Sequence, residues 1–409
     1  MGRPVRALLV ATHPVQYAVP QYRRLAADPR VDATVAFLSM HGAEVGLDPD
    51  FGVRIRWDVP LLDGYRWRHP PNRSPRSDGR GFLGLVNTEL WRLIRRGGFD
   101  VVVCHGYRAV SFWIAALAAR VSGAGLVWTT DATSLGSRDG SGLKRRVKAV
   151  GLPLVFRTGA AVFVPSSRGA EFLRTLGLPR ERVFMTPYVV DNDYFAATAA
   201  EVDVTATRAT FDVPSDHVVV AFVGKLVLWK RPWDVLRAAA RVPRVTVLMA
   251  GDGSERSTLE RLSRELGMED RVRFLGFTNQ SQLPAVYATA DILVHPSEHE
   301  PFGLVVNEAF ACGTGAFVTE ACGCADDLII SGVTGDTFPV GDVDALADLL
   351  RSLVHDRGRA ARLGEGARAR IAEWDLERWA DDTVDALTYA ASRGRRRRRR
   401  VARSLGVRR

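Results

Sequence analysis

Short, nearly continuous apolar runs recur along both halves of this 409-residue chain. They are rich in β-branched side chains, which is typical of strands buried on both faces of a parallel sheet. Stretches with helical periodicity separate them, as crossover connections between parallel strands require. The predicted strands are Val5–Ala11, Val101–Cys104, Gly125–Thr129, Ala161–Pro165, Val218–Val223, Val245–Ala250, Val272–Phe274, Ile292–Val294 and Ala316–Val318.

The two groups of strands predict two domains, because a chain of this length exceeds one ordinary hydrophobic core. We expect an α/β protein with two Rossmann-like, doubly wound domains that face a cleft, into which the carboxyl ends of the strands point. The first domain is predicted over residues 1–195 and the second over 205–374. Residues 375–391 are predicted to form a helix that packs back on the first domain, and 392–409 a disordered, arginine-rich tail.

Two segments interrupt the alternation of strands and helices. Residues 191–215 lack a sustained apolar period and are predicted to form a hinge. Residues 51–80 are rich in Pro, Gly, Arg and Trp, and they are predicted to form a long functional loop or insertion.

The net charge of +10 comes from the end of the chain. Residues 391–409 contain ten arginines and no acidic residue, and without these ten the 56 basic residues fall to 46, the number of acidic ones. A neutral folded body argues against a specific nucleic-acid partner. Arg395–Arg400 and a second basic stretch, Lys144–Lys148, are candidate contacts for an anionic membrane surface. The alternatives are a tail that only keeps the protein in solution and a tail that binds polyanions nonspecifically.

The four cysteines form neither a disulfide framework nor a zinc motif, because Cys322 and Cys324 have no second pair at suitable spacing. No Asp-x-Asp motif lies in a suitable loop, and the pair Asp326–Asp327 is predicted to begin a helix. We therefore predict no metal site. The N-terminus lacks the layout of a signal peptide, and no apolar stretch is long enough to span a bilayer. We expect a cytoplasmic protein, at the inner face of the plasma membrane if the basic stretches bind lipid.

The strongest candidate functional segment is Asp291–Ala309. A strand is followed by a loop that presents Glu300, and then by a helix that begins near Pro301 or Phe302. Backbone amides at the positive end of a helix dipole bind anions such as a sugar diphosphate, and glycine allows close approach to the ligand. The candidate amides are those of Phe302, Gly303 and Leu304.

Two carboxylates in this segment suit the neutral parts of a nucleotide sugar. Glu300 can accept hydrogen bonds from sugar hydroxyls, and the two oxygens of Glu308 can bridge two ribose hydroxyls. Glu308 lies among apolar neighbours, where an idle charge is rare. The alternative is that Glu300 caps the helix and Glu308 lies on a solvated face.

A basic cluster follows the predicted strand Val218–Val223. Gly224 and Lys225 come first, and Lys230 follows in the same loop. Two ammonium groups at the carboxyl end of a strand suit a diphosphate and can stabilise the charge that develops as it departs. A solvated basic turn is the alternative, and we predict a surface position for Arg231.

The sequence from Glu300 to Ala309, Glu-Pro-Phe-Gly-Leu-Val-Val-Asn-Glu-Ala, resembles the Glu-x7-Glu donor signature of the family 4 glycosyltransferases. The likeness extends over most of residues 210–372. It implies the GT-B fold, retention of anomeric configuration, a donor-binding second domain and an acceptor-binding first domain. It also implies that Glu300 contacts the donor sugar and Glu308 the ribose. Gly276 and Phe277 resemble the loop that holds the base.

The N-terminal sequence His13-Pro-Val-Gln-Tyr17 is similar to a His-Pro-x-Gln-Tyr subgroup of bacterial polysaccharide transferases. After the third strand many relatives have a histidine, whereas this chain has Asp131. Asp131 is a candidate base for the acceptor hydroxyl, with helix capping as the alternative. His13 and His105 are candidates for lining the acceptor side, or for structural roles in turns.

The predicted activity is a retaining, metal-independent transfer of a hexose-type sugar from an NDP-sugar to a glycan or lipid-linked acceptor. The NDP-sugar is the donor substrate, so no separate cofactor is predicted. This activity would serve cell-surface polysaccharide or glycolipid synthesis. The alternatives are a sugar-nucleotide epimerase on the same fold and a non-catalytic nucleotide-sugar-binding protein.

Overall fold

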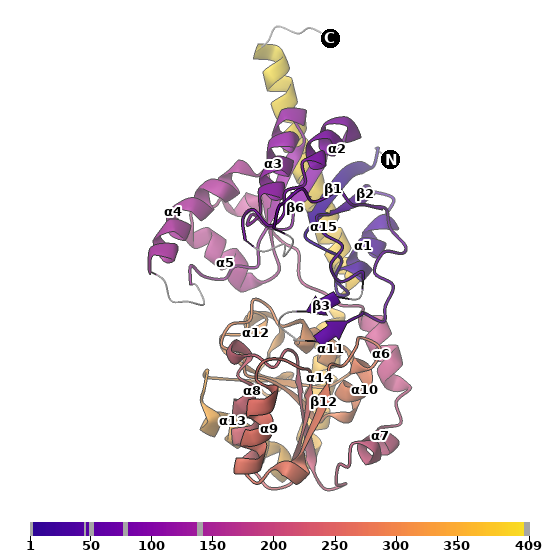
Figure 1. Cartoon of the computed structure of the whole chain (residues 1–409), viewed down its shortest axis with the longest axis vertical. Helices are drawn as coiled ribbons and strands as arrows, with labels where there is room; N and C mark the ends of the chain where they lie inside the picture. Colours follow the sequence, from indigo (N-terminus) through magenta and orange to yellow (C-terminus); the bar gives the residue numbers. More distant parts are fainter. Residues whose placement is uncertain (1–2, 45, 49–52, 77–80, 137–141, 405–409) are drawn as a thin grey trace. The chain divides into compact units, whose positions relative to one another are not determined.

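The structure, a computed structural model, describes residues 3–44, 46–48, 53–76, 81–136 and 142–404, without the side chains at 47, 48, 53, 55 and 397–404. The chain divides into two compact units, coloured along the sequence in Figure 1. Unit 1 comprises Met1–Glu44, Pro60–Tyr188 and Leu376–Arg409, and unit 2 comprises Val45–Val59 and Val189–Asp375.

Unit 1 is built on a parallel seven-stranded sheet in the order β5-β2-β1-β6-β7-β8-β9. The strand order reverses between β1 and β6, so the loops after these two strands lie at the topological switch point, where ligands of doubly wound sheets bind. The strands are β1 (Val5–Ala11), β2 (Val31–Phe37), β5 (Trp67–Arg68), β6 (Val101–Cys104), β7 (Gly125–Thr129), β8 (Ala161–Val164) and β9 (Val183–Met185). The helices are α1 (Val19–Ala26), α2 (Glu89–Gly97), α3 (Val110–Ser122), α4 (Gly142–Thr158), α5 (Ser167–Thr175), the 3-10 helix η1 (Arg180–Arg182) and α15 (Leu376–Ser404).

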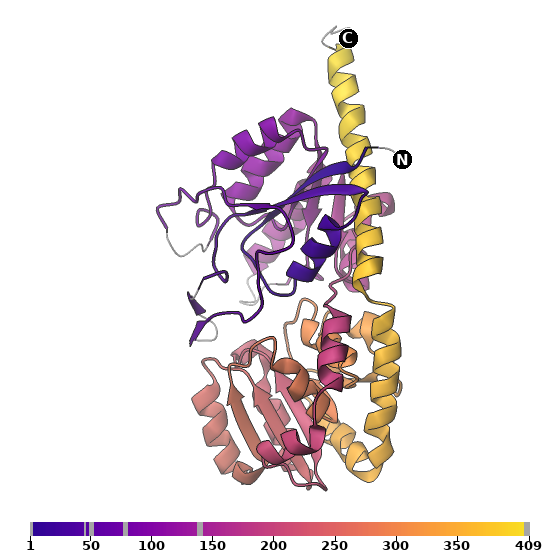
Figure 2. The ribbon, with the colours of Figure 1, turned by 90° about the vertical axis from the view of Figure 1, so that its right-hand side faces the viewer.

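The last helix, α15, packs on unit 1 beside α1 and β7, as Figure 2 shows for the yellow end of the chain. Two ion pairs join it to α1 and the turn that follows: Arg24 to Glu377 at 2.5 Å and Arg30 to Asp381 at 2.6 Å. We expected the helix to end at residue 391 and a disordered tail to follow. In the structure the helix continues to Ser404, in keeping with the high helix propensity of arginine.

Two glycines allow α15 to approach β7 closely. A Cβ at Gly125 would lie 2.2 Å from the carbonyl oxygen of Ala390, and a Cβ at Gly394 would lie 2.5 Å from the backbone nitrogen of Gly125. Strand and helix therefore meet backbone to backbone, at a distance that no larger residue permits.

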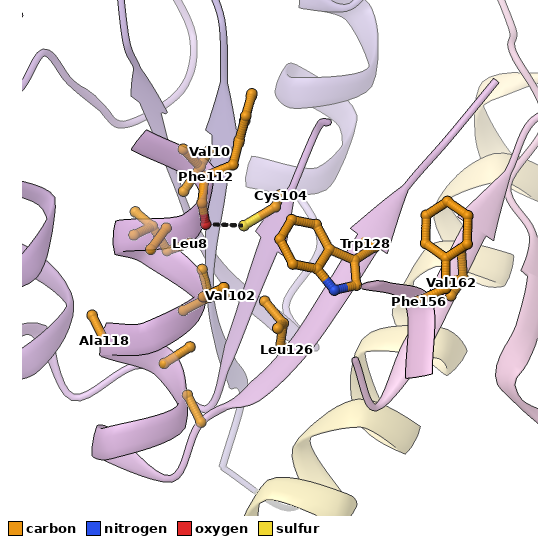
Figure 3. Packing of buried hydrophobic residues seen from close by; sticks show 14 of the residues in the cluster. Leu8, Val10, Val102, Cys104, Phe112, Ala118, Leu126, Trp128, Phe156 and Val162 are labelled. Carbon is orange, nitrogen blue, oxygen red and sulfur yellow. Dashed lines mark hydrogen bonds between the residues drawn. The ribbon is translucent and has the colours of Figure 1, made fainter. Parts of the chain in front are cut away.

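The core of unit 1 lies between its sheet and α3 (Figure 3). Leu8, Val102 and Leu126 from neighbouring strands pack with Phe112 of α3, and all four are buried. The thiol of Cys104 donates to the carbonyl oxygen of Phe112 at 3.8 Å. This cysteine is thus a core residue.

Unit 2 is built on a parallel six-stranded sheet in the order β12-β11-β10-β13-β14-β15, with the switch point between β10 and β13. The strands are β10 (Val218–Val223), β11 (Val245–Ala250), β12 (Val272–Gly276), β13 (Ile292–His295), β14 (Ala316–Thr319) and β15 (Gly335–Phe338). The helices are α6 (Asn192–Ala200), α7 (Val204–Thr210), η2 (Leu228–Lys230), α8 (Pro232–Ala240), α9 (Arg256–Glu265), η3 (Glu269–Arg271), α10 (Leu283–Thr289), α11 (Leu304–Ala311), α12 (Ala325–Leu328), α13 (Val343–His355) and α14 (Arg357–Ala372). The expectation of two doubly wound α/β sheets is confirmed.

Two predicted irregular segments contain regular structure. The expected hinge 191–215 holds α6 and α7, whose N-caps are the side chains of Asp191 and Asp203. Of residues 51–80, expected as a long loop or insertion, 51–52 and 77–80 lie outside the described residues, and the rest is divided between the units. The two-stranded antiparallel sheet of β3 (Gly46–Asp48) and β4 (Val53–Ile55) lies in unit 2, and β5 joins the sheet of unit 1. In the described part of the chain, no helix is long and apolar enough to cross a membrane.

Candidate functional site

The loops that follow β10 and β13 carry most of the predicted donor-binding residues, and these strands are neighbours in the sheet of unit 2. Gly224 directly follows β10 with a φ of 141°, which favours glycine. A Cβ at Gly251, after β11, would lie 1.9 Å from the Gly224 carbonyl oxygen, so this loop is held by backbone contact. The amide of Glu298 donates to the carbonyl oxygen of Trp229 at 2.9 Å and joins the β10 loop to the β13 loop. Lys225 and Lys230 are thereby placed at the switch point.

Glu300 is the centre of a cluster of polar and charged side chains at the switch point of unit 2. The ammonium group of Lys230 donates to Oε2 of Glu300, and Nε2 of His295 lies 3.0 Å from the same oxygen. His295 is the last residue of β13 and is completely buried, and its Nε2 also lies 3.1 Å from the hydroxyl of Ser297. The side chain of Glu300 is only 12% exposed. A basic group from one loop thus meets an acidic group from the next.

The charges in this cluster have a definite state at neutral pH. Burial alone would raise the pKa of the Glu300 carboxyl, but the Lys230 charge and the hydrogen bond with His295 outweigh it and hold the pKa well below its usual range. Burial, followed by the Lys230 charge, lowers the pKa of His295. Glu300 is therefore ionised and His295 neutral. Because a carboxylate only accepts hydrogen bonds, the neutral ring donates from Nε2.

The helix after this loop begins later than predicted. Its N-cap is Gly303, whose φ of 104° is left-handed, so α11 begins at Leu304 and not at Pro301 or Phe302. A Cβ at Gly303 would also lie 2.9 Å from the sulfur of Cys322. Of the three predicted anion-binding amides, only that of Leu304 belongs to the first helical turn, where amides lack intrahelical partners. The amides of Phe302 and Gly303 lie in the turn before it.

The loop after β14 holds the Glu300 loop in place. The amide of Gly323 donates to the carbonyl oxygen of Glu300 at 2.9 Å, and that of Cys324 donates to Phe302 at 2.8 Å. A Cβ at Gly323 would lie 1.9 Å from the carbonyl oxygen of Pro301, so the two backbones are in direct contact. Neighbouring segments therefore fix the position of the Glu300 carboxylate.

Glu308 lies one turn into α11 and is 7% exposed. The hydroxyl of Tyr287, from α10, donates to its Oε2 at 2.6 Å. Burial raises the pKa of the Glu308 carboxyl to about 7, against the opposing effect of the Tyr287 hydrogen bond. Because Tyr287 already occupies Oε2, a ribose that binds here relies mainly on Oε1. The alternative prediction, that Glu308 lies on a solvated face of the helix, does not agree with this burial.

Glu308→Gln should change how stability depends on pH. In the folded chain the Glu308 pKa is about 7, against an ordinary value of 4.5, so the wild-type loses stability as pH rises from 4.5 through 7. The variant has no carboxyl that titrates at this position. Its free energy of unfolding should therefore rise relative to that of the wild-type by roughly 3 kcal/mol between pH 4.5 and pH 8. Denaturant unfolding of both proteins across this range measures the difference. Glu265→Gln, at an exposed position on α9, is the matched control, and parallel curves for Glu308→Gln and the wild-type would contradict the prediction.

The loop predicted to hold the base follows β12. Gly276 has a φ of 73°, and its carbonyl oxygen accepts from the amide of Gly251 at 2.7 Å. Phe277 is half-buried, and its ring meets the ring of Trp57 edge-on with centroids 5.8 Å apart. The three loops after β10, β11 and β12 are thus connected along one edge of the sheet.

The candidate acceptor residues lie in unit 1. Asp131 is exposed, and it does not cap a helix, because α4 begins only at Gly142. After burial, the Asp131 charge is the next cause that raises the pKa of Tyr17 and of Tyr107, and it contributes to the raised pKa of Tyr188. The charge of Asp131 therefore acts on three tyrosines of unit 1.

The two candidate histidines follow β1 and β6, at the switch point of unit 1. Burial lowers the pKa of His105 to about 4, and its Nε2 is buried without a hydrogen-bond partner among the residues described. The ring of His13 lies 5.5 Å from the ring of His41 in an edge-on arrangement. Arg231, expected at the surface, is instead largely buried and pairs with Asp234 at 2.7 Å.

Sequence reasoning missed the contacts of four residues on the donor side. His295 ends a completely buried strand, where a histidine needs a polar partner, and this signal points to Glu300. Tyr287 supports Glu308 from another helix, and no local pattern reveals such a contact. Cys322 and Cys324, for which we predict no metal site, are both buried, and their sulfurs lie 3.5 Å apart beside Gly303. No cluster of three or more His, Cys, Asp or Glu side chains suited to a metal ion occurs within the described ranges.

Comparison with known families places both halves of the chain. Residues 203–370 match the family model described as "Glycosyl transferases group 1", and residues 4–188 match the model described as "Glycosyl transferase 4-like domain". The D-inositol 3-phosphate glycosyltransferase of Mycolicibacterium smegmatis is 38% identical over 253 residues, which are 60% of this chain and 56% of the relative. The protein of the same name from Xylanimonas cellulosilytica is 32% identical over 251 residues, 59% of each chain. The chain thus spans little more than half the length of these curated relatives.

Solved structures resemble the whole fold. The Anabaena protein HepE in complex with UDP and glucose superimposes with a TM-score of 0.72 at 20% identity, over 94% of this chain and 99% of that chain. The apo form of the lipopolysaccharide outer core galactosyltransferase WaaB gives a TM-score of 0.67 at 17% identity, over 94% and 99% of the two chains. At these identities the likeness establishes the fold alone.

Proposed function

Because this chain belongs to the family 4 glycosyltransferases and has their GT-B fold, we propose that it transfers a hexose-type sugar from an NDP-sugar to a glycan or lipid-linked acceptor, with retention of anomeric configuration. The observation that carries the proposal is the Lys230–Glu300 pair at the switch point of unit 2. An ionised carboxylate beside an ammonium group offers an acceptor for sugar hydroxyls and a counter-charge for phosphate in one place. The product would enter cell-surface polysaccharide or glycolipid synthesis.

The proposed roles of the donor-side residues follow from the negative charge that develops on the leaving group. In the reaction the bond between the anomeric carbon and the diphosphate oxygen breaks, and negative charge grows on the departing NDP. Lys225, Lys230 and the first turn of α11 would stabilise this charge. These positive groups can replace a divalent cation, so we propose transfer without a metal. Glu300 would orient the sugar, and Glu308 would orient the ribose through Oε1.

The acceptor side requires a group that receives a proton as the new glycosidic bond forms. Asp131 is the proposed base, because it is exposed in a loop after β7 of unit 1, where an acceptor hydroxyl can reach its carboxylate. His105 is a weaker candidate, since its low pKa makes it a poor proton acceptor at neutral pH. It is better suited to donate or accept a hydrogen bond.

The function is tested by measuring donor binding and then transfer. UDP-, GDP- and ADP-hexoses are screened by thermal shift, with UDP expected to bind because HepE was solved with UDP. The stabilising donor, labelled in its sugar, is then incubated with oligosaccharide, lipid-linked sugar and D-inositol 3-phosphate, the substrate that the relatives' names carry. Labelled product in the presence of EDTA supports metal-independent transfer. Isomerised donor without transfer would establish an epimerase instead, and binding without turnover a nucleotide-sugar-binding protein.

A transferase with a lipid-linked acceptor must contact a bilayer. The helix α4 has an exposed apolar face that could make this contact. Leu143, Val147, Val150 and Leu154 are 73%, 64%, 68% and 60% exposed, and their spacing places them on one side of the helix. The basic stretch Lys144–Lys148 lies beside this face, so an anionic bilayer matches both its charge and its apolar surface. Arg395 and Arg396 are exposed on α15, and the side chains at 397–400 lie outside the described residues.

Sedimentation with vesicles tests this membrane contact. The wild-type is expected to bind vesicles of phosphatidylglycerol more strongly than vesicles of phosphatidylcholine. Replacing Leu143 and Val147 by Asp should reduce binding at least about tenfold, because each buried aliphatic side chain contributes roughly 1.5 kcal/mol or more. Val333→Asp, at an exposed apolar position in unit 2, is the matched control. Equal binding of the double variant and the control would contradict the role of α4.

A further inference from the structure

A short segment from the first part of the chain docks on unit 2. Residues 53–59, here called the strap, are the end of the segment Val45–Val59, which belongs to unit 2 although the chain before Val45 and after Val59 belongs to unit 1. The strap begins with β4 and reaches the loop after β12, the loop that carries Phe277. No part of the sequence pattern predicted this contact.

Two side chains of the β12 loop bind the strap on either side of Trp57. The amide nitrogen of Asn279 donates to the carbonyl oxygen of Arg56 at 2.7 Å, and its oxygen accepts from the amide of Asp58 at 3.3 Å. The carboxylate of Asp58 accepts from both the amide and the hydroxyl of Ser281. Asn279 therefore fixes both peptide groups that flank Trp57, and the position of the indole follows from this clamp.

The indole so positioned meets the predicted base loop. Its ring stands edge-on to the ring of Phe277 at a centroid distance of 5.8 Å and an interplanar angle of 61°. Trp57 remains half-buried in this arrangement. The next residue of the loop after Asn279, Gln280, buries its side-chain oxygen with no hydrogen-bond partner in the described part of the chain. A half-buried aromatic ring is thus held against the loop after β12, and the same loop carries an unsatisfied acceptor.

We propose that Trp57 stacks on the base of the bound nucleotide and that the strap is part of the donor site. The inference rests on the proposed function, because it requires a nucleoside diphosphate sugar on unit 2. A planar aromatic ring gives stacking energy to any base, so the strap contributes affinity for the nucleoside rather than choice among bases. The hydrogen bonds of Asn279 and Asp58 serve to hold the indole in place before the nucleotide arrives.

Calorimetric titration with UDP tests the role of Trp57. Trp57→Ala is expected to weaken UDP binding about tenfold, and Trp57→Phe should restore most of the loss, because a phenyl ring still stacks. Inorganic pyrophosphate, which has no base, should bind the wild-type and Trp57→Ala equally. Trp91→Ala, at an exposed tryptophan of α2, is the matched control and should leave UDP binding unchanged.

The outcomes separate this inference from the proposed function. If the wild-type binds none of UDP, GDP and ADP at millimolar concentration, the proposed function fails and the inference fails with it. If the wild-type binds UDP and Trp57→Ala binds it equally well, only the inference is overturned. It is also overturned if Trp57→Ala weakens pyrophosphate as much as UDP, or lowers Tm by several degrees, since the strap would then have a purely structural role.

Discussion

Glu300→Gln is expected to reduce sugar transfer by roughly a thousandfold and to leave the fold intact. The amide has the size of the carboxylate but not its charge, so it accepts weaker hydrogen bonds from the sugar and leaves the Lys230 ammonium without a counter-charge. The loss of one preorganised electrostatic contact typically lowers kcat by about 10²–10³-fold. The measurement is the initial rate with labelled donor, together with Tm.

Glu298→Gln is the control for this prediction. Glu298 lies in the same loop, and its side chain is 48% exposed. Its carboxylate makes two long, partly exposed contacts, with Arg231 at 3.8 Å and with His299 at 3.7 Å, so its replacement should leave the rate within about twofold. Near wild-type turnover in Glu300→Gln would refute the assignment of the site, even if the chain is a transferase.

Lys230→Met is expected to have the second-largest effect, a loss of roughly a hundredfold or more in kcat, with a smaller rise in the donor KM. The ammonium group interacts most strongly with the diphosphate as its negative charge increases, so the transition state loses more than the ground state. The measurement is steady-state kinetics over a range of donor concentrations. Lys230→Arg keeps the charge and should retain more activity than the methionine variant.

The Lys230→Met substitution should also change how the activity depends on pH. A lysine that only supported the fold would not have this effect. The Lys230 charge lowers the pKa of Glu300, and burial opposes it. Without Lys230 the Glu300 carboxyl takes up a proton at a higher pH, so the activity of Lys230→Met should fall further at pH 5 than at pH 8, relative to the wild-type. Identical pH profiles for the variant and the wild-type would show that Lys230 does not control this carboxylate.

The strands were largely predictable because burial on both faces produces uninterrupted apolar runs. β10 and β11 begin and end at the predicted residues, and all their positions are buried. β2 escaped prediction because Asp32 and Thr34 interrupt its run at half-buried positions near the edge of the sheet. The start of α11 was misplaced because proline usually opens a helix, whereas here a left-handed glycine after Pro301 delays the first turn.

The candidate site was predictable as a set of residues but not as a set of contacts. The spacing of Glu300 and Glu308 is local, so the sequence carries it. The contacts of Lys230 with Glu300 and of Tyr287 with Glu308 join residues 70 and 21 positions apart, and only the order of the strands brings the first pair together. The docking of Trp57 on Phe277 is longer-ranged still, and no periodicity encodes it.

The close contact between Gly125 and the backbone of α15 affects the order in which the two units can fold during synthesis. The first two segments of unit 1 precede the main part of unit 2 along the chain, but the helix that packs on one side of their sheet begins only at Leu376. Unit 2, apart from Val45–Val59, is contained in Val189–Asp375 and is therefore synthesised before that helix. Unit 2 can therefore finish folding first. Until α15 is synthesised, one face of the sheet of unit 1 keeps apolar side chains uncovered. We expect this uncovered sheet surface to be prone to aggregation during synthesis and to be a place where a chaperone can bind.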